Sequence, residues 1–217
     1  LEPLRAAAAD ALGTRAVTVS DVTVREAMLL ADSPGGARAM QVVIEGTGDS
    51  RTARCCTLPA DADADATWTE HASGTLQRGA ELPADPPSLA DARARCRVKV
   101  SADELYAGFE RRGLQFGSAF RSVRTILRGP GEAVAEVALG DDVARDAGAY
   151  GIHPVLLDGC LQTVAAALAE SEAEGDDALF LPIAVGRFTV HGTATDRCWC
   201  VASATGTGST RTADVTM

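Results

Sequence analysis

One acidic residue, Asp158, stands within an otherwise apolar segment that begins a predicted helix. The segment, residues 151–162, has the sequence GIHPVLLDGCLQ. An aspartate is seldom buried without a partner, so it must accept hydrogen bonds or keep its proton. A carboxyl group held in this way can act as a general acid. Gln162 follows one helical turn later on the same face, and its amide can orient the carboxyl group.

A reading without chemistry is also open for this segment. Asp158 can cap the helix or pair with an arginine, and Gln162 and His153 can be purely structural. Pro154 suits the first turn of a helix, where the missing N–H is not needed. The helix N-terminus lowers the pKa of Asp158 and burial raises it, and the sequence leaves open which effect dominates. Gly159 allows a backbone or a ligand to approach closely.

The composition excludes several classes of function. The net charge of −10 argues against a nucleic-acid partner, because phosphate binding needs clustered lysine and arginine. No Gly-rich phosphate loop opens a helix after a strand, so no nucleotide or flavin is expected. No run of 18 apolar residues and no signal peptide are found, so we expect a cytoplasmic protein without a membrane span.

The six cysteines are predicted to be reduced thiols, most of them buried. Their spacing does not resemble a small secreted disulfide scaffold. Cys198 and Cys200 would place both sulfur atoms on one side of a strand. No second pair at zinc-like spacing lies nearby in the sequence, so no metal site is expected.

The first part of the chain is predicted to be a helix followed by an antiparallel meander. Residues 1–13 have apolar residues at helical spacing and end at a candidate C-cap, Gly13. Alternating apolar and β-branched residues then predict four strands, over 17–24, 38–46, 51–58 and 68–76. Residues 79–95 contain three of the nine prolines and no periodic pattern, which is typical of a linker.

The second part repeats this scheme. Ser101 and Glu104 form a candidate capping box for a helix over 101–112. A helix with almost no charged residues follows over about 155–170, and strands are expected at 122–128, 133–139, 179–191, 197–203 and 211–216. The fold class is therefore α+β, with a first domain over 1–95 that includes the linker and a second domain over 96–217 that carries the Asp158 helix.

Three motifs resemble the dehydratase domain of type I polyketide synthases. HPVLLDGCLQ at 153–162 resembles the family motif HPxLLDxxxQ/H. GLQFGSAF at 113–120 resembles GYxYGPxF, and LPIAV at 181–185 resembles LPFxW. The motifs occur in family order and at family spacing, and the resemblance covers nearly the whole chain.

The resemblance implies a double hot-dog fold, in which two antiparallel sheets each wrap around a long central helix. It implies a hydro-lyase that removes water from a β-hydroxyacyl thioester on an acyl carrier protein. Asp158 matches the catalytic acid and Gln162 its hydrogen-bonding neighbour. The residues expected to line the substrate site are Phe116, Gly117, Phe120, His153, Pro154, Leu157, Leu181 and Pro182. The expected partners are the carrier protein with its phosphopantetheine arm, neighbouring synthase domains and a second copy of the chain, and no cofactor or metal is expected to be bound.

The chain departs from the family pattern at three places. The histidine motif HxxxGxxxxP is absent, and His71, His153 and His191 do not fill its position. We expect the catalytic histidine upstream of Leu1, and the alternative is a degenerate copy. Phe116 and Ser118 replace the usual tyrosine and proline. Ile183 and Val185 replace bulkier aromatic residues, which can widen the acyl tunnel.

Other functions fit the same residues. A related double hot-dog domain could shift a double bond or close a ring with a similar His/Asp pair. A catalytically silent structural domain of a megasynthase fits the missing histidine, although Asp158 and Gln162 argue against it. A free-standing acyl-binding module is a further alternative. Four arginines form the densest basic cluster and are candidates for carrier-protein docking or for a solvated face: Arg111, Arg112, Arg121 and Arg124.

Overall fold

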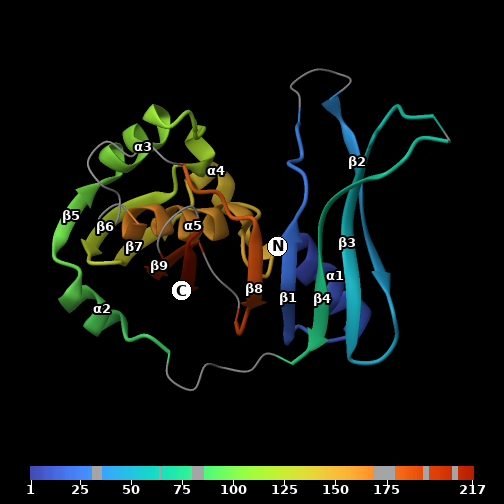
Figure 1. Cartoon of the computed structure of the whole chain (residues 1–217), viewed down its shortest axis with the longest axis horizontal. Helices are drawn as coiled ribbons and strands as arrows, with labels where there is room; N and C mark the ends of the chain where they lie inside the picture. The colour runs from blue at the N-terminus through green and yellow to red at the C-terminus, as the bar shows by residue number, and fades with distance from the viewer. Residues whose placement is uncertain (31–35, 64, 80–85, 169–178, 193–195, 207–209) are drawn as a thin grey trace. The chain divides into compact units, whose positions relative to one another are not determined.

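The computed structural model divides the chain into two compact units, each built on a five-stranded antiparallel sheet (Figure 1). The first unit contains Leu1–Leu82 and Leu181–Gly192, and the second contains Pro83–Phe180 and Thr193–Met217. The structure describes residues 1–30, 36–63, 65–79, 86–168, 179–192, 196–206 and 210–217.

The first unit packs helix α1 (Glu2–Leu12) against a sheet of strand order β2-β3-β4-β1-β8. Leu4, Ala8 and Leu12 recur every four residues and are buried in the core against this sheet. Gly13 ends the helix with φ at +64°, a left-handed conformation that glycine adopts without a Cβ clash. The strands are β1 (Val17–Val24), β2 (Arg38–Glu45), β3 (Ser50–Pro59), β4 (Thr69–Arg78) and β8 (Ala184–Thr189).

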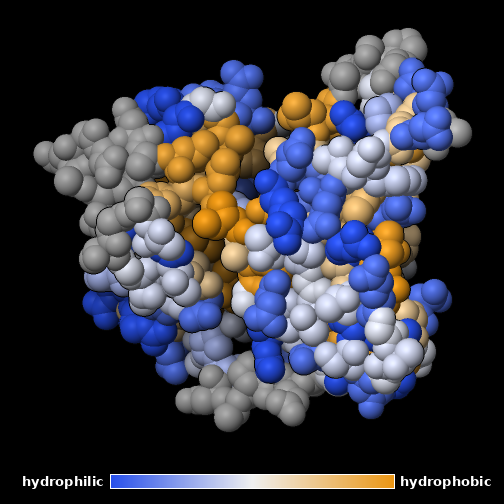
Figure 2. Space-filling model, turned by 45° about the vertical axis from the view of Figure 1, so that its right-hand side comes forward, coloured by the Kyte–Doolittle hydropathy of each residue, from blue (hydrophilic) through white to orange (hydrophobic). Residues whose placement is uncertain are grey.

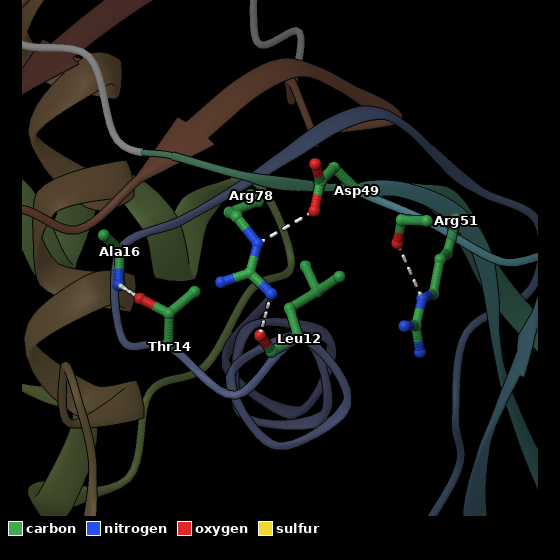
Figure 3. A network of polar contacts seen from close by, with 7 residues as sticks. Leu12, Thr14, Ala16, Asp49, Arg51 and Arg78 are labelled. Carbon is green, nitrogen blue, oxygen red and sulfur yellow. Dashed lines mark hydrogen bonds and ion pairs between the residues drawn. The ribbon is translucent and has the colours of Figure 1, made fainter.

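A side-chain bridge holds the C-terminus of α1 to the sheet (Figure 3). The guanidinium of Arg78, at the end of β4, donates one hydrogen bond to the carbonyl oxygen of Leu12 and another to Asp49 Oδ1 at 2.9 Å. Leu12 O is among the last helical carbonyls, which lack a partner within the helix. A cation at this end also interacts favourably with the helix dipole. Arg78 therefore fixes where α1 ends relative to the β2–β3 turn.

The second unit packs the longer helix α5 (Pro154–Leu168) against a sheet of strand order β10-β9-β7-β6-β5. The helix contacts four of the five strands, which is the burial that its nearly uncharged sequence predicts. The strands are β5 (Val98–Ser101), β6 (Val123–Gly129), β7 (Glu132–Ala138), β9 (Arg197–Thr205) and β10 (Thr212–Thr216). The remaining helices are α2 (Leu89–Arg95), α3 (Ala102–Arg111) and α4 (Asp141–Ala144), with short 3-10 turns η2 (Ser118–Phe120) and η3 (Ala147–Ala149).

Helix α2 covers the other face of this second sheet. It packs on β7 and β9 through Ala92, and Arg93 lies 4.6 Å from the centre of the Trp199 ring. Trp199 and its neighbour Cys200 point to opposite faces of β9, as alternation in a strand requires. The second sheet is therefore covered by helices on both faces, α5 on one and α2 on the other.

Most predicted elements are confirmed, including the helix over 1–13 and the capping box of α3 at Ser101 and Glu104. The structure differs from the predicted elements in several places, and strand β5 and helix α4 were not predicted. Residues 89–95, within the predicted linker, form α2, whose first turn is capped by the Ser88 side chain. Strand β8, which follows α5 along the chain, pairs with β1 and so joins the first sheet instead of the second.

Much of the surface seen in Figure 2 is hydrophilic, and hydrophobic residues reach the surface in smaller areas. Among the residues that the structure describes, the most exposed large apolar side chains are Leu29, Leu30, Ile183 and Leu181, all in the first unit. Among the described residues, no helix is both long enough and apolar enough to cross a bilayer.

Candidate active site

Helix α5 presents Asp158 from its second turn. Pro154 begins the helix, and the N–H of Val155 donates to Nδ1 of the His153 ring at 3.1 Å. Because a backbone N–H can only donate, Nδ1 is an acceptor, and the proton of the neutral ring lies on Nε2, 3.4 Å from Asp146 Oδ1. Tyr150 packs edge-on against the same ring at 4.8 Å. His153 therefore caps the helix and fixes where it starts.

Asp158 lies half-buried and accepts a hydrogen bond from Gln162. The distance from Gln162 Nε2 to Asp158 Oδ2 is 2.7 Å, which confirms the predicted contact across one helical turn. Among the described residues, no cation pairs with Asp158, and Oδ1 has no hydrogen-bond partner. The carboxyl group is therefore held by a neutral amide at one oxygen, and the other oxygen is available to a ligand.

Burial raises the pKa of Asp158, and the hydrogen bond from Gln162 lowers it by a smaller amount. The net direction is upward, because the charged form loses water and gains only one amide donor. The effect of burial, which the sequence left in balance with the helix N-terminus, dominates here. A carboxyl group that keeps its proton more readily than an ordinary aspartate suits general-acid chemistry.

Gln162 is itself held on both ends of its amide. Nε2 also donates to the carbonyl oxygen of Phe120 at 3.0 Å, and Oε1 accepts from the hydroxyl of Tyr106 at 3.0 Å. Gln162 and Tyr106 are both buried. The amide therefore has a defined orientation, with its NH2 group toward Asp158.

Ser122, which immediately precedes β6, and Val137 on β7 pack closely against the turn that carries Asp158. A Cβ on Gly159 would lie 2.4 Å from Ser122 Oγ and 2.5 Å from Val137 Cγ1, so only glycine fits. Ser122 Oγ donates to the carbonyl oxygen of Val155 at 3.2 Å. The space beside Gly159 is thus filled by Ser122 and Val137 and not by a ligand. This contact fixes the distance of the Asp158 turn from β6 and β7.

Aromatic rings enclose the Tyr106 side of the site. Phe116 packs edge-on against Tyr106 at 5.9 Å and against Phe109 at 5.0 Å. Phe116 stands where the family motif has a tyrosine, and Tyr106 comes from α3, ten residues earlier in the chain. The sequence predicted the helix over 101–112 that contains Tyr106, but this residue was given no role at the site, and its hydrogen bond to Gln162 was missed.

The other predicted site residues are distributed over both units. In the second unit, Leu157 is half-buried beside Asp158, Phe120 contributes its carbonyl oxygen to Gln162, and Gly117 is exposed at the start of η2. His153 and Pro154 form the helix start described above. Leu181 and Pro182 are exposed in the first unit, immediately before β8.

The two other histidines differ in environment. His71 is buried in the first unit, where Nε2 lies 2.7 Å from Thr57 Oγ1 and Nδ1 lies 3.0 Å from the carbonyl oxygen of Glu26. Both ring nitrogens of His71 are therefore engaged by the protein. His191 is exposed after β8.

The cysteines are free thiols, and Cys160 on α5 contacts Cys198 and Cys200 on β9. Cys160 Sγ lies 3.9 Å from Cys198 Sγ, and Cys200 donates a weak hydrogen bond to the carbonyl oxygen of Cys160. Hydrogen bonding to Cys198 raises the pKa of Cys160, so this thiol stays protonated. Among the described residues, no group of three or more histidine, cysteine, aspartate or glutamate side chains could hold a metal ion.

At least three of the four clustered arginines interact with other residues of the protein: Arg112, Arg121 and Arg124. Arg121 forms an ion pair with Glu110 at 2.6 Å and lies 5.1 Å from the centre of the Tyr106 ring. Arg124 donates to the carbonyl oxygen of Ala138 at 3.2 Å. Arg111 and Arg124 are exposed.

Comparisons with known proteins bear on this site. The family described as polyketide synthase dehydratase N-terminal domain matches residues 84–217, which is more than half of the chain. A mycocerosic acid synthase-like polyketide synthase of Mycobacterium tuberculosis is 31% identical over 211 residues, which cover 93% of this chain and 10% of that protein. The polyketide synthase GfsB of Streptomyces halstedii is 34% identical over 144 residues, 65% of this chain and 2% of the relative. The chain thus spans a small part of the curated relatives that it matches.

Solved structures of dehydratase domains have the same fold. The dehydratase domain of the CurK module of curacin polyketide synthase matches with a TM-score of 0.80 and 25% identity, over 93% of this chain and 69% of that one. The same CurK domain also matches as two inactive mutants, in one of which a histidine is replaced by phenylalanine and in the other an aspartate by asparagine. These neighbours are double hot-dog domains, which confirms the predicted α+β double hot-dog fold. The chain belongs to the dehydratase-domain family of polyketide synthases, whose members are hydro-lyases.

Proposed function

We propose that this chain removes water from a β-hydroxyacyl thioester to give an α,β-enoyl thioester, with Asp158 as the general acid. The observation that supports this role is a half-buried carboxyl group whose partner is an amide, with no ion-paired cation among the described residues. Hydroxide is a poor leaving group, and a proton delivered from Asp158 converts it to water.

The proposed reaction transfers two protons, one from the α-carbon to a base and one from Asp158 to the leaving hydroxyl. A base takes a proton from the α-carbon, the C–O bond at the β-carbon breaks, and Asp158 gives its proton to the departing oxygen. The products are the enoyl thioester, water, a protonated base and an aspartate anion. The family resemblance assigns the base to a histidine in the motif HxxxGxxxxP.

The two influences on Asp158 serve opposite stages of this reaction. Burial favours the protonated acid before the step, and the Gln162 amide stabilises the anion after it. Oδ2 accepts from Gln162, so Oδ1 is the oxygen that would carry the transferred proton. The inactive aspartate-to-asparagine mutant of the CurK dehydratase supports an essential aspartate in this family.

The substrate would arrive as a thioester on the phosphopantetheine arm of an acyl carrier protein, beside neighbouring synthase domains. The acyl chain would contact the predicted lining residues, among which Phe120 accepts a hydrogen bond from Gln162 through its carbonyl oxygen and Leu157 precedes Asp158 in α5. The exposed arginines Arg111 and Arg124 would attract an acidic carrier protein. A homodimer stays a prediction from the resemblance.

The test is dehydration, measured by mass spectrometry on the full-length protein. A β-hydroxyacyl pantetheine or carrier-protein thioester is supplied at several chain lengths, and loss of one water is followed. Asp158→Asn keeps the hydrogen bond from Gln162 but cannot donate an acid proton, so we expect a rate loss of about 10²–10⁴-fold. Asp214→Asn, at an exposed position of β10, is the matched control and keeps its activity.

Three results would count against the proposal in different ways. Dehydration that persists in Asp158→Asn would remove Asp158 from the acid role. No loss of water by the parent protein at any chain length would favour a silent structural domain. An isomerised or cyclised product, which has no change in mass, would favour a domain that shifts a double bond or closes a ring.

A further inference from the structure

The hydroxyl of Tyr106 is the centre of a hydrogen-bonded chain that leads to Asp158. Tyr106 is 3% exposed, so water does not satisfy its hydroxyl. The N–H of Val123, at the start of β6, donates to this oxygen at 3.1 Å. The hydroxyl in turn lies 3.0 Å from Gln162 Oε1 and 3.5 Å from the carbonyl oxygen of Phe120.

The direction of each hydrogen bond in this chain is fixed by chemistry. A backbone N–H can only donate, so Tyr106 accepts from Val123 and keeps its own hydrogen for the next partner. The amide oxygen of Gln162 can only accept, so it takes that hydrogen. The NH2 group of Gln162 then faces the carbonyl oxygen of Phe120 and Asp158 Oδ2, which are both acceptors. A flipped amide would place its oxygen against two oxygens and leave Tyr106 without an acceptor at 3.0 Å.

Three elements therefore contribute residues to this hydrogen-bonded chain. Tyr106 belongs to α3, Val123 to β6, and Gln162 and Asp158 to α5. Packing keeps the phenol ring in place, because Phe109 and Phe116 contact it within the same unit. The charged groups that interact electrostatically with the Tyr106 hydroxyl are Arg124 on β6, Asp158 on α5, and Arg121, whose guanidinium lies over the phenol ring. Neither arginine forms an ion pair with Asp158.

We propose that Tyr106 is a positioning residue for the acid, and that it acts through Gln162. The phenol hydrogen bond holds the Gln162 amide in the orientation that donates to Asp158, and thereby holds Oδ1 toward the substrate. This inference rests on the proposed role of Asp158. Phe116 lacks the hydroxyl of the tyrosine that is usual at its position in the family. In this chain the phenol that orients Gln162 would therefore come from Tyr106 on α3.

A purely structural role is the competing explanation. In that case Tyr106 would serve only to satisfy the buried N–H of Val123 and to fill the core of the unit. Its removal would then lower stability without changing the acid. The test must therefore separate loss of fold from loss of orientation.

The variant to compare is Tyr106→Phe, which keeps the ring and deletes the hydroxyl. We expect kcat for dehydration to fall about tenfold with KM nearly unchanged, the size of effect of one hydrogen bond. The basic limb of the pH profile should move to higher pH, because a loosened Gln162 lowers the pKa of Asp158 less. Tyr150→Phe is the matched control, since among the described residues its hydroxyl has no hydrogen bond, and it should change neither quantity.

A double-mutant cycle tests whether Tyr106 acts through Gln162. In a Gln162→Leu background, Tyr106→Phe should cause no further loss of kcat. An additional tenfold loss in that background would overturn the inference. So would an unchanged pH limb in the single variant, or a raised KM with an unchanged kcat, which would indicate contact with substrate.

A second readout does not depend on catalysis. The thermal stability of each variant is compared with that of the same variant carrying Asp158→Asn, as a function of pH. The pH at which ionisation of Asp158 lowers the Tm should be higher in Tyr106→Phe than in the parent. A shift without any dehydration activity would support the positioning role and contradict the proposed function. Dehydration by the parent, with no such pH shift in Tyr106→Phe, would support the proposed function and contradict the positioning role of Tyr106.

Discussion

The central helices of the two units hold their acidic residues in opposite ways. Glu2 in α1 is buried and receives two hydrogen bonds from Arg5, at 2.6 and 2.7 Å. Asp158 in α5 is half-buried and receives one hydrogen bond from the Gln162 amide. The guanidinium neutralises its partner, whereas an amide orients without neutralising. The same architecture thus uses one carboxylate for stability and leaves the other able to exchange a proton.

The helices also meet their sheets through different residues. Helix α1 buries Ala8 completely against the first sheet. Helix α5 needs Gly159 at its closest contact, because Ser122 and Val137 occupy the space of a Cβ. Helix α5 therefore packs more closely on its sheet at Gly159, next to the candidate acid, than α1 does at Ala8.

The largest effect on stability is expected from Gly159→Ala. The added methyl group must displace Ser122 or Val137, which costs about 2 kcal/mol and outweighs the better helix propensity of alanine. Dehydration should slow as well, since the clash moves the adjacent Asp158. Denaturant unfolding and the mass-spectrometric assay measure both. Gly148→Ala, where a Cβ would meet no atom within 4 Å, is the control, and equal costs for the two variants would contradict a tight contact at Gly159.

A similar loss is expected when the paired carboxylate of the first unit is neutralised. Glu2→Gln removes the charge opposite Arg5, and losing hydrogen bonds between charged groups costs about 2 kcal/mol. Asp142→Asn breaks an i,i+3 pair with Arg145 that is mostly exposed, and it should cost less than about 1 kcal/mol. Urea unfolding of both variants measures the difference. If the two losses are equal, burial does not strengthen the Glu2–Arg5 pair.

Neutralising Asp158, which has no cation as partner among the described residues, should raise the free energy of unfolding, and by less than Glu2→Gln lowers it. Because burial raises the pKa of Asp158 in the folded state, the folded protein keeps a proton that the unfolded chain has released. The parent therefore loses stability as the pH rises from the ordinary aspartate pKa through the raised value. Asp158→Asn has no such ionisation, so its free energy of unfolding should exceed that of the parent at neutral pH and match it below the ordinary aspartate pKa. Thermal unfolding at several pH values measures this gain, and a destabilised variant at neutral pH would show that the anion is held favourably.

Local patterns were enough to predict most of the elements and the Asp158–Gln162 contact. The contact was predictable because residues four apart share a helix face, and the helix itself was marked by Pro154 and an apolar run. The capping box at Ser101 and Glu104 was predictable for the same local reason.

Features that depend on distant residues were not predictable in this way. Tyr106 looks like a core aromatic residue in the sequence, and its partner Gln162 lies 56 positions later. The pairing of β8 with β1 leaves no local trace, since a strand pattern does not name its neighbour. Helix α2 was hidden by the prolines before it, although Ser88 and Asp91 give a capping signal.

Strand β8 also sets an order of events during biosynthesis. Its partner β1 leaves the ribosome about 160 residues earlier, and at about 5–20 residues per second the interval is roughly 8–32 seconds. Until β8 emerges, one side of β1 exposes unpaired backbone groups, while most of the second unit has already been synthesised. Nascent chains are therefore open to strand mispairing and chaperone binding at this edge. The first sheet is completed only after the helix that carries Asp158 has been made.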